Sequence, residues 1–321
     1  MTQRPLISVA LSVYNGARFL RRQLDSILAQ RDVRIEVVAV DDGSRDGSVA
    51  LLREYMERDP RVQLHVNPQN LGPTRSFERA MSLCRGEFLA PSDQDDFWQP
   101  DKLATLLAAI GEHDLAYCDS EYIDSDDRPS GRRISDDLDM LRGTSLMQFV
   151  FANSVSGHAA LLRRSLFEEV RPLPPGLYYD WVLAMFAAAR NGIVYVDQAL
   201  VQFRRHQEAF SSLGTADRVR PPSRNRAWFN ERKLLLQALI GSRFDGNGSA
   251  ARTLQALEIA VSGQSRLPLL RAIWRERDPA SHGQRSAAFN AIRLQSRVLR
   301  KLHRARGEPE LVDASFDPAK A

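Results

Sequence analysis

The sequence has 321 residues and a formal net charge of +4, with 43% hydrophobic and 26% charged residues. This composition is typical of a globular protein and excludes an intrinsically disordered chain. No apolar stretch approaches the roughly 20 residues that a membrane span needs, and the apolar run at residues 7–13 is too short for a signal peptide. The chain also has only two cysteines, whereas a secreted framework usually has more pairs, so we expect a cytoplasmic protein.

The first 120 residues alternate between strand-like and helix-like segments. The predicted strands are residues 7–13, 35–40, 62–66, 87–90 and 115–118, and the predicted helices are residues 19–28, 48–57, 76–84 and 102–110. Strands that alternate with helices favour an α/β fold, with a mainly parallel, Rossmann-like sheet that is covered by helices on both faces.

The pattern changes after residue 120. Residues 120–143 are polar and predict a surface loop or flap, whereas residues 161–170 and 180–190 have helical patterns and residues 193–196 a strand pattern. Beyond residue 214 the pattern becomes helical only. We therefore expect a domain at 1–214, with halves 1–120 and 121–214, and a helical C-terminal region at 215–321.

The C-terminal region is basic, because residues 215–321 carry 20 Lys or Arg against 10 Asp or Glu. This excess favours contact with a polyanion. Its last predicted helix, residues 286–304, has arginines around an apolar face. That pattern fits a helix on an anionic membrane, and equally a helix that packs its apolar face on the core. The aromatic residues do not interleave with the arginines, which disfavours nucleic-acid binding.

Polar clusters follow three of the predicted strands. Residues 12–16 (SVYNG) end the first strand, residues 41–44 (DDGS) end the second, and residues 93–96 (DQDD) end the fourth. In an open parallel sheet, ligands bind at the carboxyl ends of the strands, near the point where the strand order reverses. The three clusters therefore predict one ligand site at one edge of the sheet.

The clusters lack the glycine patterns that bind phosphates through the backbone. Neither a G-x-G-x-x-G fingerprint nor a Walker loop is present, which argues against a dehydrogenase and a P-loop NTPase. Nucleotide recognition must then come from side chains. Tyr14 can stack on a base, and a carboxylate from Asp41 or Asp42 can accept a hydrogen bond from a base or ribose.

Asp93, Asp95 and Asp96 place three carboxylates within four residues. Like charges about 4 Å apart repel by roughly 4 kcal/mol at an effective dielectric near 20, and a divalent cation relieves this repulsion. Mg²⁺ or Mn²⁺ commonly binds one or two protein carboxylates and completes its shell with water and substrate phosphates. The alternative is a solvated helix N-terminus that Asp95 or Asp96 caps.

Taken together, these motifs resemble the family 2 glycosyltransferases. The resemblance rests on Tyr14-Asn15, residues 40–44 (VDDGS), residues 70–72 (NLG) and the Asp-x-Asp at 93–95, and it covers roughly residues 5–210. The segment at 92–102 (SDQDDFWQPDK) is similar to rhamnosyltransferase-like members. The resemblance implies a GT-A fold, an inverting mechanism and a nucleotide-diphosphate sugar as donor.

The resemblance also assigns roles by position. Ser12, Tyr14 and Asn15 would line the nucleotide-sugar site together with Asp41 and Asp42, with Asp42 at the edge of the base. Arg75 would reach the nucleotide, Asp93 the ribose and Asp95 the metal. Because Asp95 and Asp96 are adjacent in this chain, the carboxylate that touches the metal is uncertain by one position.

Two downstream motifs complete the resemblance. Residues 178–181 (YYDW) are similar to the acidic motif that carries the catalytic base, which implies Asp180 as the group that takes the acceptor's proton. Residues 203–206 (FRRH) are similar to the family's late Arg/His motif, which implies His206 as a metal ligand or a hydrogen-bond donor to the diphosphate. Helix capping by Asp180 and a surface position for His206 remain open.

We therefore predict an inverting, Mg²⁺- or Mn²⁺-dependent glycosyltransferase that acts on a saccharide or lipid-linked acceptor. The donor sugar suggested by the resemblance is rhamnose, and the site of action is cell-surface polysaccharide or glycolipid synthesis, with peripheral contact to the inner face of the membrane. Two rivals remain: a nucleotidyltransferase on a related sheet, and a non-catalytic protein that binds sugar nucleotides.

Overall fold

The structure is a computed structural model that describes residues 4–205, 224–245, 248–275 and 287–305. The described strands are β1 (Leu6–Val13), β2 (Arg34–Asp41), β3 (Val62–Val66), β4 (Phe88–Ser92), β5 (Phe97–Trp98), β6 (Leu115–Ile123), β7 (Pro129–Arg133), β8 (Ala160–Arg163) and β9 (Ile193–Arg204).

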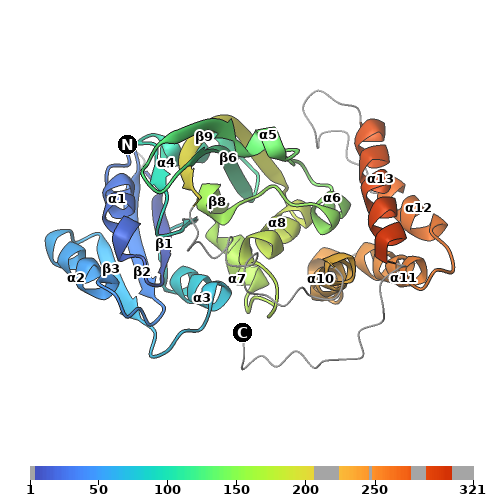
Figure 1. Cartoon of the computed structure of the whole chain (residues 1–321), viewed down its shortest axis with the longest axis horizontal. Helices are drawn as coiled ribbons and strands as arrows, with labels where there is room; N and C mark the ends of the chain where they lie inside the picture. The colour runs from blue at the N-terminus through green and yellow to red at the C-terminus, as the bar shows by residue number, and fades with distance from the viewer. Residues whose placement is uncertain (1–3, 206–223, 246–247, 276–286, 306–321) are drawn as a thin grey trace.

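Helices surround this sheet in the first part of the chain and form a separate layer in the last part (Figure 1). The described α-helices are α1 (Ala17–Leu28), α2 (Ser48–Arg58), α3 (Pro73–Leu83), α4 (Lys102–Ile110), α5 (Ile134–Asp137), α6 (Leu146–Phe151), α7 (Arg164–Val170), α8 (Tyr179–Ala189), α10 (Arg224–Leu239), α11 (Ser249–Val261), α12 (Leu267–Arg275) and α13 (Ala287–Ala305). Two 3₁₀ helices are η1 (Gly157–Ala159) and η2 (Arg243–Asp245).

The strands form one mixed sheet in the order β3-β2-β1-β4-β8-β6-β9-β5, with β7 beside β6. β3, β2, β1 and β4 are parallel to one another, and β8 pairs antiparallel with both β4 and β6. The chain runs from β1 outward to β3 and then returns to β4 on the other side of β1. The strand order therefore reverses between β1 and β4, where the carboxyl ends of a parallel sheet open a crevice.

The central strands are buried on both faces, and alternate residues enter two separate hydrophobic cores. Val9 and Leu11 of β1 join a core that α1, α2 and α4 cover. Ala10 of β1 and Val38 of β2 join a second core that α3, α7 and α8 cover. A side-chain period of two with apolar residues in both registers is the pattern of a strand that has helices on both sides. The predicted α/β, GT-A-like sheet is confirmed.

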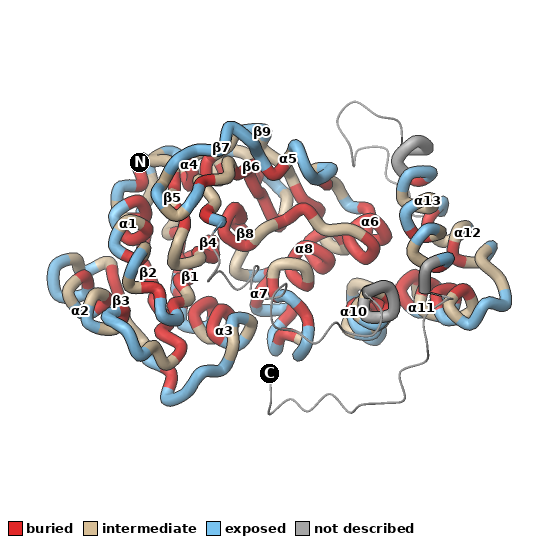
Figure 2. The backbone as a smooth tube through the Cα atoms, in the orientation of Figure 1, coloured by how far each residue is buried: buried red, intermediate tan, exposed pale blue. Residues whose placement is uncertain are grey.

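The C-terminal helices continue the second core. Phe229 of α10, Leu257 of α11 and Val298 of α13 are almost fully buried and belong to the same cluster as residues of α6 and α8. Figure 2 shows buried stretches on the sides of α10, α11 and α13 that face their neighbours. The apolar side of the basic last helix therefore packs on protein, although Ile292 of α13 remains 52% exposed.

Two segments differ from the sequence prediction. Residues 161–163, the start of the helix predicted at 161–170, belong to strand β8, because pairing with β4 and β6 decides the conformation of a short apolar run. The polar segment at 120–143, predicted as a loop, contains the end of β6, the hairpin strand β7 and the short helix α5. Within the described ranges, no helix combines the length and apolar character that a bilayer-crossing segment requires.

Candidate active site

The loops after β1, β2 and β4 meet at one edge of the sheet, as their parallel pairing requires. The side chain of Gln94 joins two of these loops, because its Oε1 accepts a hydrogen bond from the Tyr14 backbone N–H at 2.7 Å and its Nε2 donates to the Tyr14 carbonyl at 3.0 Å. A Cβ atom on Gly16 would collide with the end of the Gln94 side chain, so glycine at this position leaves room for the two hydrogen bonds of Gln94. The amide extends the strand ladder beyond the end of β1.

The loop that contains Tyr14 and Asn15 is also tied to the loop after β2. The Asn15 backbone N–H donates to Ser44 Oγ, and Asn15 Oδ1 accepts from the Arg45 N–H, both at 2.9 Å. Asn15 has a φ of 49°, a left-handed conformation that asparagine tolerates better than most residues. Tyr14 remains 46% exposed, so its ring is available to a ligand. Ser12 is partly buried below it.

Asp41 and Asp42 are buried and bind backbone groups. Asp41 Oδ1 accepts the N–H groups of Gly43 and Ser44. Asp42 accepts three donors: the Asn67 side chain at 2.6 Å, and the backbone N–H groups of Leu71 and Gly72, both at 2.9 Å. Both carboxylates therefore hold loops in place. Asp41 Oδ2 is buried and has no hydrogen-bond partner among the described residues.

Arg75 lies on the first turn of α3, just after the two residues, Leu71 and Gly72, whose backbone N–H groups bind Asp42. Its guanidinium forms an ion pair with Glu78 at 2.5 Å and donates to the Leu173 carbonyl at 3.3 Å. The side chain is 44% exposed. In this conformation Arg75 links α3 to the segment that precedes α8.

An acidic cluster lies directly after β4. Asp93 Oδ2 is 3.7 Å from His158 Nδ1, and Asp96 Oδ2 is 3.9 Å from the same nitrogen. One ligand atom from each of these three residues lies within 4.8 Å of the other two. Asp96 and His158 are buried, whereas the Asp93 side chain is 42% exposed and forms the open side.

The carboxyl groups of the cluster have raised pKa values, because burial and neighbouring negative charges disfavour their ionised forms. Burial, together with the neighbouring carboxylates of Asp95 and Asp180, raises the pKa of Asp93 to about 7. Burial and the charges of Asp95 and Asp93 raise the pKa of Asp96 well above its ordinary value. Burial lowers the pKa of His158 to about 3, so its imidazole is neutral. Asp96 Oδ2 is buried and has no hydrogen-bond partner in the described part of the chain.

Two buried basic side chains, those of Lys102 and Arg204, hold the residues of the cluster in place. Lys102, at the start of α4, donates from Nζ to the His158 carbonyl at 2.6 Å, and its Nζ lies 3.1 Å from the centre of the Trp98 ring. Burial lowers the pKa of Lys102 to about 7. The second cation is Arg204, at the end of β9, which is only 1% exposed.

Arg204 connects three segments around the acidic loop. Its backbone N–H donates to Asp96 Oδ1 at 3.1 Å, its Nε to the Asp95 carbonyl at 2.8 Å and its Nη1 to the Asp124 carbonyl at 2.7 Å. It also forms an ion pair with Asp127 in the β6–β7 hairpin, and Asp127 in turn pairs with Arg22 of α1. Arg204 therefore fixes the orientation of the loop that carries Asp95 and Asp96.

Asp180 lies on the first turn of α8 and faces the same space. Its Oδ1 accepts the Trp181 N–H at 2.7 Å, and its Oδ2 accepts the Gly157 N–H at 3.3 Å. Burial raises the pKa of Asp180 to about 6, and its charge contributes to the raised pKa of Asp93. A Cβ atom on Gly157 would lie 1.8 Å from the Tyr179 hydroxyl oxygen, so the close approach of α8 depends on this glycine.

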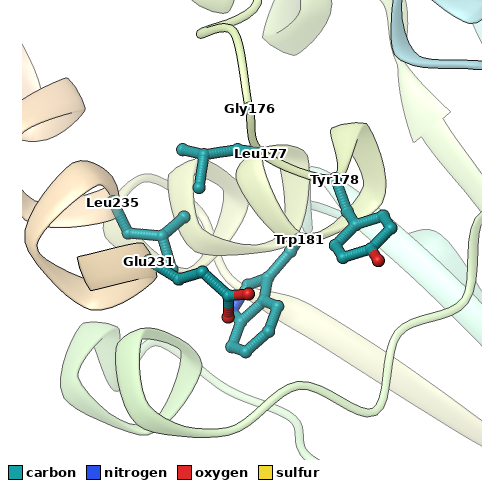
Figure 3. Close-up of a pocket in the computed structure, with 6 residues that line it drawn as sticks. All are labelled: Gly176, Leu177, Tyr178, Trp181, Glu231 and Leu235. Atoms are coloured by element: carbon teal, nitrogen blue, oxygen red, sulfur yellow. The ribbon is translucent and has the colours of Figure 1, made fainter. Parts of the chain in front are cut away.

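The C-terminal helices reach the start of α8 through an aromatic stack. The guanidinium of Arg232 in α10 lies 4.1 Å from the Trp181 ring centre and 4.4 Å from that of Trp228. Figure 3 shows Tyr178 and Trp181 of the α8 terminus beside Glu231 of α10, around a small cavity. The residue next to Asp180 is therefore packed against the helical region.

The donor set fits a divalent cation. Two carboxylate oxygens and a neutral imidazole nitrogen are ordinary ligands for Mn²⁺ and related ions. The separations of 3.7 and 3.9 Å from His158 Nδ1 to the two carboxylates fall within the span of about 4.2 Å that two ligands at about 2.1 Å from one ion can reach, and all three ligand atoms lie within 4.8 Å of one another. The partnerless, buried Asp96 Oδ2 is the kind of atom that a cation would satisfy.

The structure brings most of the predicted residues to one edge of the sheet and adds others. Asp93 and Asp180 lie together, and Asp95 lies between the two carboxylates of the cluster in sequence. His206 lies outside the described residues. Lys102 had no assigned role in the sequence prediction, and neither His158 nor Arg204, which lies in the motif at residues 203–206, was expected at the metal cluster. His158 stands directly before the apolar run at 159–162, which does not by itself predict burial of a histidine.

Comparison with known proteins identifies the family. Residues 8–171 match the family model of glycosyl transferase family 2, and the chain belongs to that family. An uncharacterized glycosyltransferase of Nostoc sp. is 32% identical over 210 residues, which are 63% of this chain and 62% of the relative. Chondroitin synthase of Escherichia coli is 34% identical over 103 residues, or 32% of this chain and 15% of that protein. The chain thus spans less than two thirds of these relatives.

Solved structures share the GT-A fold. Staphylococcus aureus TarS 1–349 in complex with UDP-GlcNAc has a TM-score of 0.62 and 17% identity, with 94% of this chain and 87% of that chain covered. The mannosyltransferase PcManGT of Pyrobaculum calidifontis, in complex with GDP-Man and Mn²⁺, has a TM-score of 0.52 and 19% identity, with 95% and 87% covered. At these identities the likeness concerns the fold.

Proposed function

We propose that the chain is an inverting, metal-dependent glycosyltransferase that moves a sugar from a nucleotide-diphosphate sugar to an acceptor hydroxyl. The observation that carries this proposal is the group of Asp93, Asp96 and His158 with Asp180 beside it, at the carboxyl end of β4 where the strand order reverses. One-step inversion needs a group that takes the acceptor's proton and positive charge that stabilises the leaving diphosphate, and a general base and a bound cation supply these.

The donor's nucleotide would lie over the loops after β1 and β2. Tyr14, which is 46% exposed, offers a ring face to the base, with Asn15 and Ser12 close by. Asp41 and Asp42 are buried and hold the shape of the loop that receives the base. Arg75 would reach a phosphate by leaving Glu78. TarS and PcManGT, in complex with UDP-GlcNAc and GDP-Man, support a nucleotide-sugar ligand on this fold.

The diphosphate would be bound at the acidic cluster. Asp93 and Asp96 would hold Mg²⁺ or Mn²⁺ together with His158, and Asp95 and His206 are the further candidates that the family motifs suggest. A bound cation supplies positive charge to the diphosphate as it leaves. Lys102 and Arg204 contribute by holding the His158 carbonyl and the Asp95–Asp96 loop in place.

Asp180 acts as the general base. One oxygen of its carboxylate takes the proton of the acceptor hydroxyl while that oxygen forms a bond to the anomeric carbon. The bond from the anomeric carbon to the diphosphate breaks on the opposite side, and the nucleoside diphosphate leaves, so the configuration inverts. Burial supports this role, because it raises the pKa of Asp180 to about 6 and makes it a stronger base.

The acceptor is a saccharide or a lipid-linked saccharide in the synthesis of a cell-surface polysaccharide or glycolipid. The similarity to chondroitin synthase supports polymer synthesis, and the segment at 92–102 makes dTDP-rhamnose the first donor to test. We assign residues 1–120 to the donor half, 121–214 to the acceptor half and 215–321 to a helical region. The site of action is the cytoplasmic side, at the membrane periphery.

The experiment measures release of nucleoside diphosphate from a panel of nucleotide sugars with Mn²⁺, after a thermal-shift screen selects the donor. A ligand at 100 times its dissociation constant adds about 2.7 kcal/mol of stability. Replacement of Asp180 with Asn is expected to lower kcat by about 10²- to 10⁴-fold and to leave donor binding intact. Glu57→Gln, on the exposed side of α2, is the matched control.

Each rival predicts a different result. Unchanged transfer by Asp180→Asn would remove the assigned base. Donor binding without turnover in the wild-type protein, on every acceptor tested, would favour a non-catalytic sensor. Release of pyrophosphate from a nucleoside triphosphate and a sugar phosphate would identify a nucleotidyltransferase.

A further inference from the structure

A hollow that shares no residue with the acidic cluster lies between α13 and the segment that contains α6. It has a volume of about 320 Å³, which is within the range of about 300–1,000 Å³ that is typical of small-molecule sites. One wall comes from residues 138–153 and the other from residues 292–300. Figure 1 shows that α6 lies beside α13, which is at one end of the molecule.

The hollow has a positive charge. One face of α13 presents Arg293, Arg297 and Arg300 to it, at a spacing of four and then three residues, which places the three side chains on one stripe of a helix. Among the described lining residues the acidic one is Asp139, on the opposite wall, and it forms an ion pair with Arg293 at 2.8 Å. In the described part of the chain, Arg297 and Arg300 have no carboxylate partner.

The same hollow has apolar surface at its mouth. Ile292 is 52% exposed and Leu138 is 43% exposed, and they lie on opposite walls. Leu141 and Leu294 add further apolar lining, and the described lining residues include no aromatic side chain. Among them a nucleotide base finds no ring on which to stack, so the combination of Arg297 and Arg300 with aliphatic side chains fits another class of ligand.

The walls are held in fixed positions. Leu141 is bound through its backbone, since its N–H donates to Ser154 Oγ at 2.8 Å and its carbonyl accepts from the Tyr117 hydroxyl at 2.7 Å. On the other side, Val298 of α13 is fully buried in the shared core, which fixes the rotation of the helix. The hollow is therefore a formed site with its arginines directed by the packing of α13.

We propose that this hollow binds an amphiphilic phosphate ester, with the phosphate on Arg297 and Arg300 and the alkyl chain against Ile292 and Leu138. A phosphate monoester carries about −1.5 to −2 charges at pH 7, which matches two guanidinium groups, and arginine binds phosphate oxygens in a two-pronged manner. The site can be tested without any sugar transfer, because its readout is binding.

The test is isothermal titration of the full chain with octyl phosphate, inorganic phosphate and octyl glucoside, the last of which has the same alkyl chain without the charge. Octyl phosphate is expected to bind at least about tenfold more tightly than inorganic phosphate or octyl glucoside, since its phosphate and its alkyl chain each add contacts. Equal binding of octyl glucoside and octyl phosphate would overturn the proposal.

Variants locate the binding. The double variant R297E/R300E is expected to lose octyl phosphate binding by at least about 30-fold, while R271E/R275E, on two exposed arginines of α12, makes the same charge change and is expected to retain it. Ile292→Ser is expected to weaken octyl phosphate and to leave inorganic phosphate unchanged. Circular dichroism checks that each variant folds. Equal losses in both double variants would show a diffuse charge effect and contradict a defined site.

Discussion

The site contains two pairs of neighbouring aspartates that resemble each other in sequence and differ in chemistry. Asp41 and Asp42 lie after β2, and Asp42 accepts three hydrogen bonds from Asn67, Leu71 and Gly72. Asp93 and Asp96 lie after β4, with raised pKa values and one buried oxygen, Asp96 Oδ2, that has no partner in the described residues. Asp42 is satisfied by the protein, whereas Asp41 Oδ2, like Asp96 Oδ2, is buried and has no partner among the described residues. Only the second pair combines raised pKa values with a neighbouring imidazole nitrogen, that of His158.

This difference indicates which acidic residues hold structure and which hold a ligand. Backbone N–H groups already neutralise the charge of the first pair, so removal of a carboxylate there breaks a loop. In the second cluster, the carboxylates of Asp95 and Asp180 raise the pKa of Asp93, and those of Asp95 and Asp93 raise the pKa of Asp96, so a cation is an effective stabiliser there. Proximity of aspartates in sequence does not separate these two cases.

The largest expected effect is on cation affinity. Asp96→Asn is expected to raise the dissociation constant for Mn²⁺ by more than about 100-fold, because loss of a direct ligand should exceed the roughly 10- to 100-fold cost of losing an outer partner. Asp42→Asn is expected to change the dissociation constant for Mn²⁺ by less than about threefold, because Asp42 binds the loop after β3 and is neither a ligand nor an outer partner of the cluster. Titration followed by the electron paramagnetic resonance of free Mn²⁺ measures both. Similar losses in the two variants would break the comparison.

Arg204 should give a smaller effect on the same quantity. Its guanidinium holds the Asp95 carbonyl and the Asp124 carbonyl without touching the reacting atoms. Arg204→Met is expected to weaken Mn²⁺ by about 10-fold or somewhat more, as loss of an outer partner does, and to raise the Mn²⁺ concentration needed for half-maximal transfer. Arg204→Lys should not restore it, since lysine cannot make both bonds. A normal Mn²⁺ requirement in Arg204→Met would contradict the positioning role.

The two clusters should also respond with opposite signs in stability. In metal-free protein, Asp42→Asn is expected to lower the free energy of unfolding by about 1–3 kcal/mol, because donors lose their acceptor. Asp96→Asn removes a carboxyl group whose ionised form is disfavoured by burial and by the neighbouring carboxylates, and is expected to raise the free energy of unfolding by about 1 kcal/mol. Urea unfolding in the presence of EDTA measures both. Destabilisation of similar size in the two variants would show that Asp96 is structural as well.

The smallest expected effect is the dependence of stability on pH in metal-free protein. The pKa of Asp93 is raised from 3.8 to about 7, so the protonated form favours the fold. Its contribution is complete below pH 3.8 and is lost as the pH rises through 7, which we expect to lower the unfolding free energy by about 1–2 kcal/mol for a half-exposed group.

This dependence can be assigned to one residue. Asp93→Asn should flatten the fall between pH 4 and 7, and Mn²⁺ should oppose it, because a bound cation favours the ionised carboxylate. A slope that is the same in Asp93→Asn and the wild-type protein would assign it to another group, such as Asp180, whose pKa is also raised, to about 6.

Much of the fold follows from local patterns in the sequence. The apolar run at residues 7–13 and the polar residues directly after it predicted β1 and the edge of the site, because strand period and strand-end position are local properties. Strand β8 was not predictable in this way, since Ala-Leu-Leu can form a helix or a strand and its partners β4 and β6 make the choice.

The site was predictable only in part. Asp93 and Asp180 were found through motifs, whereas His158 enters the cluster from a segment 62 residues after Asp96, and no spacing rule joins them. Lys102 resembled an ordinary residue at a helix start, and only the three-dimensional structure places it under Trp98 and against the His158 carbonyl. Long-range packing determined these roles.

Anomalous diffraction at the manganese edge, from crystals grown with Mn²⁺ and a nucleoside diphosphate, tests the central claim most directly. We expect one strong peak bounded by Asp93, Asp96 and His158, with the diphosphate on its open side. A peak beside Asp41 and Asp42, or a diphosphate bound with no manganese near the second cluster, would contradict the assignment.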